Sequence, residues 1–161
     1  MNSHDQLPAI EEAMEAAGRY VFAPVPIVSM GSRVRFSGDG PANWTVYMMV
    51  SRPKKKEWSK WRSLPGAYIE TGRPEPSVIS GTKQLQTMRK IIRDYTRPDD
   101  TVWDPYAGTG TTLLAAVMEG RRAVGSEVNP KTWACAVKRL KRWDAQPQLP
   151  GISLVPEECS L

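Results

Sequence analysis

Two glycines in one short segment are the clearest candidates for ligand-binding chemistry. The segment reads Asp104-Pro105-Tyr106-Ala107-Gly108-Thr109-Gly110-Thr111-Thr112. Gly108 and Gly110 allow the backbone to turn sharply and to approach a ligand closely, because glycine has no Cβ. A helix that begins after Gly110 would present free N–H groups at its N-terminus, where a carboxylate is favoured.

A carboxylate further along the chain makes this pattern more specific. Glu127 follows Gly108 by about 20 residues, the spacing at which dinucleotide-binding folds place the acid that binds the ribose hydroxyls. The combination predicts a cofactor that contains adenosine. Two glycines are also typical of an ordinary tight connection between a strand and a helix. Leu113 replaces the third glycine of the GxGxxG pattern, which argues against NAD.

The segments around the turn predict the elements that position it. Strands are expected over Thr101–Trp103 and Arg122–Ser126, with a helix over Thr111–Glu119 between them. Asn129 caps a further helix, with Pro130 at its first position. The buried face of that helix is expected to consist of Trp133, Val137 and Leu140. This order is typical of half of a doubly wound nucleotide-binding sheet.

The first part of the chain predicts a helix and an antiparallel hairpin. The helix is expected over residues 5–17, and the two strands over Tyr20–Met30 and Trp44–Val50. Pro24 and Pro26 lie two residues apart, so their missing N–H groups fall on the same side of the first strand. We therefore expect an edge strand.

A basic segment that contains two tryptophans follows the hairpin and predicts contact with DNA. It lies within residues 52–76, which are expected to form a loop. Lysines can neutralise phosphates, and tryptophans can stack on bases or insert into a duplex. The candidate DNA-binding residues are Lys54, Lys55, Lys56, Trp58, Lys60, Trp61 and Arg62. The alternative is a solvated loop whose tryptophans cover the sheet.

The composition narrows the function classes further. Lys and Arg total 22 against 17 Asp and Glu, a net charge of +5 that suits nucleic acid but is equally typical of a basic soluble protein. His4, Cys135 and Cys159 have no metal-ligand spacing, so neither a metal site nor a catalytic histidine triad is expected. No segment approaches the roughly 20 apolar residues of a membrane helix, and the cysteine usage suits a reducing cytoplasm.

The segment Lys83–Leu140 resembles the permuted-order (β-class) DNA amino-methyltransferases, which modify adenine N6 or cytosine N4. Members of that family typically contain, in this order along the chain, QKP, a helix, NPGDxVLDPFxGSGTT, a helix, GRRxIGxEx and NPxY with another helix. This chain has TKQ, a helix expected over Lys83–Tyr95, TRPDDTVWDPYAGTGTT, a helix, GRRAVGSEV and NPKTW with a helix. The segment FSGDGPANWTVYMMVSRP also resembles the segment before the target-recognition loop of phage-type members.

The resemblance implies S-adenosylmethionine as the cofactor. Glu127 would hold the ribose, and Lys83 stands where the family has a lysine near the cofactor carboxylate. Thr82 and Gln84 replace the glutamine and proline that usually flank this lysine, and Ile79 replaces the usual histidine. The residues expected to line the methionine and backbone side of the cofactor are Asp104, Pro105, Tyr106, Gly108, Gly110 and Thr111.

The family's catalytic motif is Asp, Asn or Ser followed by two prolines and an aromatic residue, and the 161 residues contain no Pro-Pro pair. In the family this motif accepts hydrogen bonds from the exocyclic amine, and its aromatic ring stacks on the flipped base. In permuted members the motif precedes the first helix expected here. No catalytic residue is therefore assigned within this chain.

The family's sheet has the strand order 3-2-1-4-5-7-6. Residues 101–103 and 122–126 would be its strands 1 and 2, and the hairpin its strands 6 and 7. The expected fold class is thus α/β, an incomplete Rossmann-like methyltransferase sheet that lacks the central strands 4 and 5. Unpaired parallel strands would expose apolar edges, so we expect a second polypeptide, upstream sequence or a homo-oligomer to complete the sheet.

One partial domain is expected to span residues 1–161. Its segments are the helix and hairpin (5–51), the basic loop (52–78), the cofactor-binding unit (79–143) and a flexible tail (144–161). Three functions stay open: a DNA methyltransferase that works only when completed, a non-catalytic DNA-binding or interaction module derived from one, and a different Rossmann-type enzyme. Restriction–modification and phage-borne modification both fit the first of these.

Overall fold

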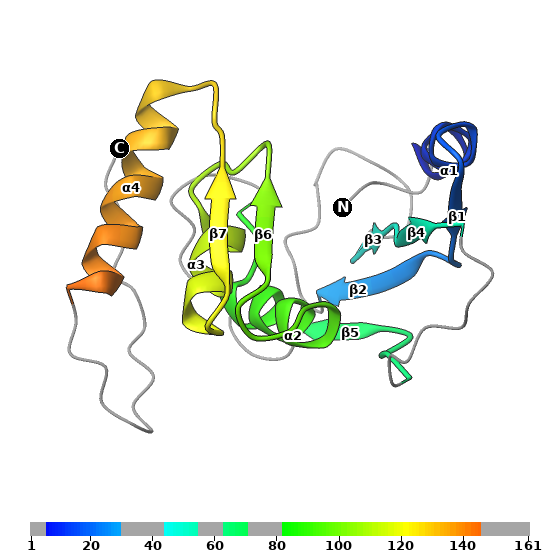
Figure 1. Ribbon diagram of the computed structural model, residues 1–161, viewed down its shortest axis with the longest axis horizontal. Helices are drawn as coiled ribbons and strands as arrows, with labels where there is room; N and C mark the ends of the chain where they lie inside the picture. Colours follow the sequence, from blue (N-terminus) through cyan, green and yellow to red (C-terminus); the bar gives the residue numbers. More distant parts are fainter. Residues whose placement is uncertain (1–5, 30–43, 55–62, 71–81, 146–161) are drawn as a thin grey trace. The chain divides into compact units, whose positions relative to one another are not determined.

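The chain forms two compact units, residues 1–72 and 73–161, and each is described separately. The computed structural model describes residues 6–29, 44–54, 63–70 and 82–145 (Figure 1). The strands in these ranges form three separate sheets, two in the first unit and one in the second.

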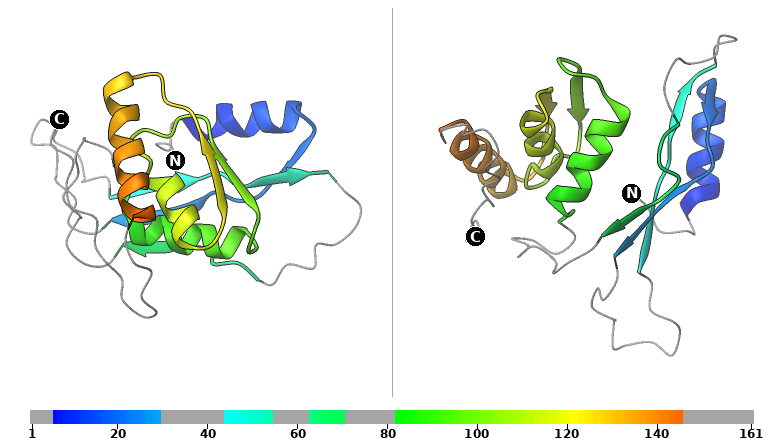
Figure 2. Two further views of the ribbon diagram at one scale, coloured as in Figure 1. Left: turned by 60° about the vertical axis from the view of Figure 1, so that its left-hand side comes forward. Right: turned by 90° about the horizontal axis from the view of Figure 1, so that it is seen from below.

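The first unit contains one helix and short strands (Figure 2). Helix α1 (Leu7–Ala16) confirms the helix expected over residues 5–17, and Leu7, Ile10 and Met14 are half-buried along one face. The strands are β1 (Arg19–Val21), β2 (Val25–Ser29), β3 (Thr45–Met48), β4 (Ser51–Pro53) and β5 (Tyr68–Glu70). Val25, Ile27 and Tyr68 are the buried hydrophobic residues of the unit among those described.

The expected hairpin is confirmed, because β2 pairs with β3 in an antiparallel ladder from Val25 opposite Met48 to Val28 opposite Thr45. The single strand expected over Tyr20–Met30 is instead divided into β1 and β2 by residues 22–24. Pro24 lies in this break, where its missing N–H removes no ladder hydrogen bond. The turn between the hairpin strands lies outside the described residues.

The expectation of an edge strand is wrong, since β2 lies between β3 and β5. The Ser29 N–H donates to the Trp44 carbonyl on the β3 side, so alternation points the missing N–H of Pro26 away from β3. On that other side β5 pairs in parallel only with Ile27–Ser29. The sheet therefore tolerates Pro26 because β5 begins just beyond it.

The loop expected over residues 52–76 contains strand structure at two places. β4 pairs with β1, with Arg52 opposite Tyr20, and β5 is the parallel neighbour of β2. Tyr68 is buried while Ile69 is exposed, as alternation in a strand requires. Three residues are too few for such alternation to stand out in the sequence.

The second unit is built around a strand–helix–strand connection. Its elements are α2 (Leu85–Tyr95), β6 (Thr101–Asp104), α3 (Thr111–Met118), β7 (Arg122–Gly125) and α4 (Pro130–Asp144). β6 and β7 pair in parallel, from Thr101 opposite Arg122 to Asp104 opposite Gly125. Figure 1 shows the two strands side by side, with α3 behind them. All five elements confirm the sequence-based expectations.

The core of this unit lies between α2 and α3. It contains Leu85, Met88, Ile91, Ile92, Leu113, Leu114, Ala115 and Ala116. Two ion pairs connect the same helices, since the Glu119 carboxylate is 2.6 Å from Arg89 Nε and 2.9 Å from Arg93 Nε. Helix α3, which begins at the last residues of the glycine turn, is therefore packed and ion-paired against α2.

The expected buried face of α4 is wrong. Trp133 is exposed, Val137 and Leu140 are only half-buried, and the buried residues are Cys135 and Ala136. The small Ala136 packs against Gly110, where a larger residue would not fit. The close approach of α4 to the turn, rather than hydrophobicity alone, determines which side of α4 is buried.

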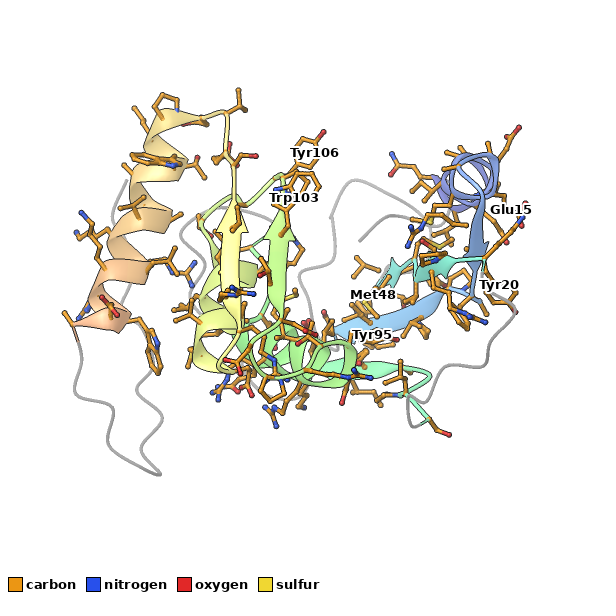
Figure 3. All side chains as sticks on the ribbon, viewed as in Figure 1. Glu15, Tyr20, Met48, Tyr95, Trp103 and Tyr106 are labelled. Carbon is orange, nitrogen blue, oxygen red and sulfur yellow. The ribbon has the colours of Figure 1, made fainter. Side chains whose placement is uncertain are left out.

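One face of the β6–β7 pair is not covered by the other described residues of the second unit. Trp103 and Val124 are directly opposite each other in the ladder and are 70% and 54% exposed. Parallel strands are normally covered on both faces. Figure 3 shows Trp103 projecting from β6 near the end where the glycine turn begins.

Candidate cofactor site

The glycine turn joins the end of β6 to α3 through a specific backbone path. Gly108 and Gly110 have φ values of 55° and 78°, in the left-handed region that favours glycine. The Ala107 N–H donates to the Ser126 carbonyl (2.9 Å), and the Ser126 N–H donates to the Asp104 carbonyl (3.1 Å). The turn is therefore tied to the segment that leaves β7.

Two glycines allow close packing around this turn. A Cβ on Gly110 would be 3.0 Å from the Ala136 Cβ, and a Cβ on Gly125 would be 2.8 Å from the Leu113 Cδ1. Leu113 stands where the dinucleotide pattern has its third glycine, whose role there is close packing of the helix on the strand. In this chain the strand supplies the glycine instead, at Gly125.

Glu127 directly contacts the glycine turn. Its Oε2 accepts a hydrogen bond from the Gly108 N–H (2.9 Å), and its Oε1 accepts one from the Asn129 N–H (2.9 Å). A carboxylate has about four lone-pair sites, so about two stay available for further donors. The side chain is half-buried, and the backbone fixes its position from both sides.

The residues before Gly108 differ in exposure. The Asp104 carboxylate accepts a hydrogen bond from the Tyr106 N–H (3.1 Å), and the Tyr106 side chain is 84% exposed (Figure 3). The Ser126 hydroxyl donates to the Pro105 carbonyl (2.9 Å). The structure thus brings Asp104, Pro105 and Tyr106 to the same end of the strand pair as Glu127.

Thr111 is oriented differently from the residues at the front of the turn. It is buried, and its hydroxyl accepts a hydrogen bond from Arg139 Nη1 at 3.2 Å. Arg139 was not singled out in the sequence, because no local pattern indicates a bond from a later helix to a carbonyl in the turn. Asn129 was expected only as a helix cap, and it caps α4 through Lys131 N–H (3.0 Å) and Thr132 N–H (3.3 Å).

The remaining predicted residues lie apart from this cluster. Lys83 is exposed and precedes the N-cap of α2 by one residue, and the described part of the second unit gives it no ion pair. Lys54 is exposed directly after β4 in the first unit. The other candidate DNA-binding residues, which are Lys55, Lys56, Trp58, Lys60, Trp61 and Arg62, lie outside the described residues.

Two further observations limit the chemistry of the described ranges. They contain no group of three or more His, Cys, Asp or Glu side chains arranged to hold a metal ion. None of their helices is long and apolar enough to cross a membrane. Burial, and secondarily the charge of Asp94, raise the pKa of Tyr95, which lies at the end of α2 and outside the glycine turn.

Comparison with known proteins identifies the class to which this turn belongs. The sequence model of the DNA methylase family, of the N6/N4 methyltransferase type, matches residues 45–138. This match covers more than half of the chain, and the chain therefore belongs to that family. S-adenosylmethionine is the cofactor of the family, in agreement with the prediction.

Individual relatives support the same class. Type II methyltransferase M.BglI of Bacillus subtilis is 36% identical over 77 residues, which are 48% of this chain and 22% of that protein. Type II methyltransferase M.HindIII of Haemophilus influenzae is 43% identical over 58 residues, or 36% of this chain and 19% of that protein. The match thus spans about a fifth of the length of each of these curated relatives.

The fold also resembles solved methyltransferase structures. The crystal structure of the M1.HpyAVI–SAM complex superposes with a TM-score of 0.72 at 25% identity. The superposition covers 86% of this chain and 71% of that one. The α/β fold class is therefore confirmed at the level of the family.

Proposed function

We propose that the second unit binds S-adenosylmethionine for transfer of its methyl group to an exocyclic amine of DNA, at adenine N6 or cytosine N4. The observation that carries this proposal is the Glu127 carboxylate, held by the Gly108 and Asn129 N–H groups beside the turn. Family membership supports the reaction type, and the SAM complex of M1.HpyAVI supports the choice of cofactor.

The residues at the turn fit an adenosyl cofactor. Glu127 retains acceptor capacity for two ribose hydroxyls, since only one hydrogen bond to each oxygen comes from the backbone. Gly108 has open space where a Cβ would be, so a ligand can approach its backbone closely. Asp104, Pro105, Tyr106, Gly110, Thr111 and Lys83 complete the proposed cofactor-binding set, with Lys83 near the carboxylate of the cofactor.

The chain's own residues would orient the cofactor rather than move protons. When bound, S-adenosylmethionine supplies an electrophilic methyl group on a sulfonium, which a neutral amine of the base can attack. The amine needs hydrogen-bond acceptors to keep its lone pair available and a surface on which the flipped base can stack. The sequence contains no Pro-Pro-aromatic motif that would supply them.

We propose that a segment outside these 161 residues completes the enzyme, as part of the permuted, β-class order of motifs. The two-stranded β6–β7 sheet supports this requirement, because no further strand among the described residues of the second unit pairs with either of its edges. A further polypeptide would supply the catalytic motif and pair with an open edge. A homo-oligomer is the alternative arrangement. Size-exclusion chromatography with light scattering tests this part, and a well-folded, monodisperse monomer contradicts it.

DNA contact is assigned to the basic segment that begins at Lys54. Exposed Lys54 directly follows β4, and residues 55–62 continue it with three further lysines, one arginine and two tryptophans. Phosphate contacts by such residues give a salt-dependent affinity. This assignment suits a modification enzyme of restriction–modification or phage origin, because both act on duplex DNA.

A radiolabelled methyl-transfer assay tests the proposed function directly. The chain is incubated with DNA and S-adenosylmethionine, with and without a second polypeptide that carries a Pro-Pro-aromatic motif. We expect transfer only in the combined reaction, and loss of transfer with Glu127→Ala. If the completed assembly binds DNA without transferring methyl groups, the chain is a non-catalytic module, which the absence of the motif also favours.

A further inference from the structure

Arg139 connects α4 to the centre of the glycine turn. Its Nη1 donates to the Thr109 carbonyl at 2.7 Å and lies 3.2 Å from the hydroxyl oxygens of both Thr109 and Thr111. Thr109 and Thr111 are 6% and 5% exposed, and the guanidinium is half-buried. One charged side chain therefore satisfies three acceptors at the start of α3.

The Thr109 carbonyl is a sensitive point of the turn because of its neighbours. Gly108 and Gly110 both have positive φ values, and glycine loses more conformational freedom on ordering than any other residue. The Thr109–Gly110 peptide is held locally on its N–H side, because the Gly110 N–H donates to the Ala107 carbonyl (2.8 Å). A hydrogen bond from a cation on another helix holds the carbonyl side of the same peptide.

Helix stability alone does not account for this position. Cations are unfavourable near the N-terminus of a helix, and Arg139 lies against the first residue of α3. The charge of Arg139 there is better explained by the conformation that it imposes on the turn.

We propose that Arg139 is a positioning residue that holds the Thr109 peptide and keeps the turn in its cofactor-binding conformation before the cofactor arrives. This inference rests on the proposed function. In this conformation the Gly108 N–H points to Glu127. Thr111 was expected to line the cofactor directly. It contributes to this arrangement because its buried hydroxyl accepts a hydrogen bond from Arg139.

The test compares Arg139→Met and Arg139→Lys with Lys138→Met, an exposed neighbour on the same helix. Amide hydrogen exchange of the full chain is measured without cofactor, and S-adenosylmethionine binding is measured by calorimetry. We expect Arg139→Met to speed exchange selectively at residues 108–111 and to weaken binding about tenfold, which corresponds to about 1.4 kcal/mol. Arg139→Lys should restore much of both, and Lys138→Met should change neither.

Two outcomes overturn the inference. One is unchanged exchange at residues 108–111 in Arg139→Met. The other is a uniform increase over α2 and α3, which would indicate a structural role for the whole unit. If Arg139→Met does not fold, Thr111→Val removes one acceptor and should raise exchange at the same amides. Absence of cofactor binding by the unmodified protein, both alone and with the completing polypeptide, would contradict the proposed function, whereas the exchange pattern would still test Arg139.

Discussion

Each unit has a carboxylate at the end of a short strand, but the two carboxylates have different partners. In the first unit Glu70 is the last residue of β5 and accepts a hydrogen bond from the Ser29 hydroxyl. In the second unit Glu127 follows β7 and accepts from the backbone N–H groups of Gly108 and Asn129. A hydroxyl rotates freely, whereas a backbone N–H is fixed by the fold.

The difference shows what distinguishes a candidate site from ordinary sheet structure. At Glu127 three segments meet: the glycine turn, the end of β7 and the start of α4. At Glu70 the hydrogen bond joins only two neighbouring strands. Fixed donors that converge on one carboxylate from several segments give a preorganised acceptor for a ligand.

The largest expected effect contrasts one glycine from each unit. Gly110→Ala should lower the free energy of unfolding by about 3 kcal/mol, because a left-handed φ and the contact with Ala136 both penalise a Cβ. Gly18→Ala should cost about 1 kcal/mol, because its φ is also positive but the space around it is open. Urea denaturation measures the loss of unfolding free energy in both variants, and equal losses would contradict the close packing of Gly110 against Ala136.

A second contrast concerns which unit contacts DNA. The triple variant Lys54→Glu, Lys55→Glu and Lys56→Glu should reduce the salt slope of DNA binding by about 3, or about one for each lost phosphate contact. The matched control is Lys131→Glu, Lys138→Glu and Lys141→Glu, three exposed lysines of α4. Fluorescence anisotropy at several salt concentrations measures both slopes. An equal reduction in the control would remove the assignment of DNA contact to the first unit.

The smallest expected effect concerns the support behind the turn. Arg93→Met should lower the free energy of unfolding by about 0.5 kcal/mol, because this arginine is half exposed and its pair with Glu119 is screened by solvent. Arg89→Met should cost about 1 kcal/mol, since Arg89 is more buried and closer to the same carboxylate. A larger loss for Arg93 than for Arg89 in denaturation would contradict this ranking.

The sequence predicted the second unit well because its contacts are close along the chain. The strand, turn, helix and strand from Thr101 to Gly125 follow one another directly, so local patterns specify each element. Glu127 was recognised through its spacing from Gly108, and the two are hydrogen-bonded. The cofactor roles of these residues stay predictions.

Features that depend on distant residues could not be predicted in this way. The central position of β2 requires β5, which lies about 40 residues later and is only three residues long. The buried side of α4 follows from the need for a small residue against Gly110, a requirement that hydrophobic periodicity does not contain. The bond from Arg139 to a carbonyl has no sequence pattern at all.

The most direct measurement is calorimetric titration of S-adenosylmethionine into the unmodified protein, Glu127→Ala and Glu70→Ala, each with and without the completing polypeptide. We predict saturable binding for the unmodified protein and for Glu70→Ala. Glu127→Ala should bind about 100-fold more weakly, a loss of about 2.8 kcal/mol. Equal affinity of the Glu127→Ala and Glu70→Ala proteins, or no binding in any assembly, would contradict the account.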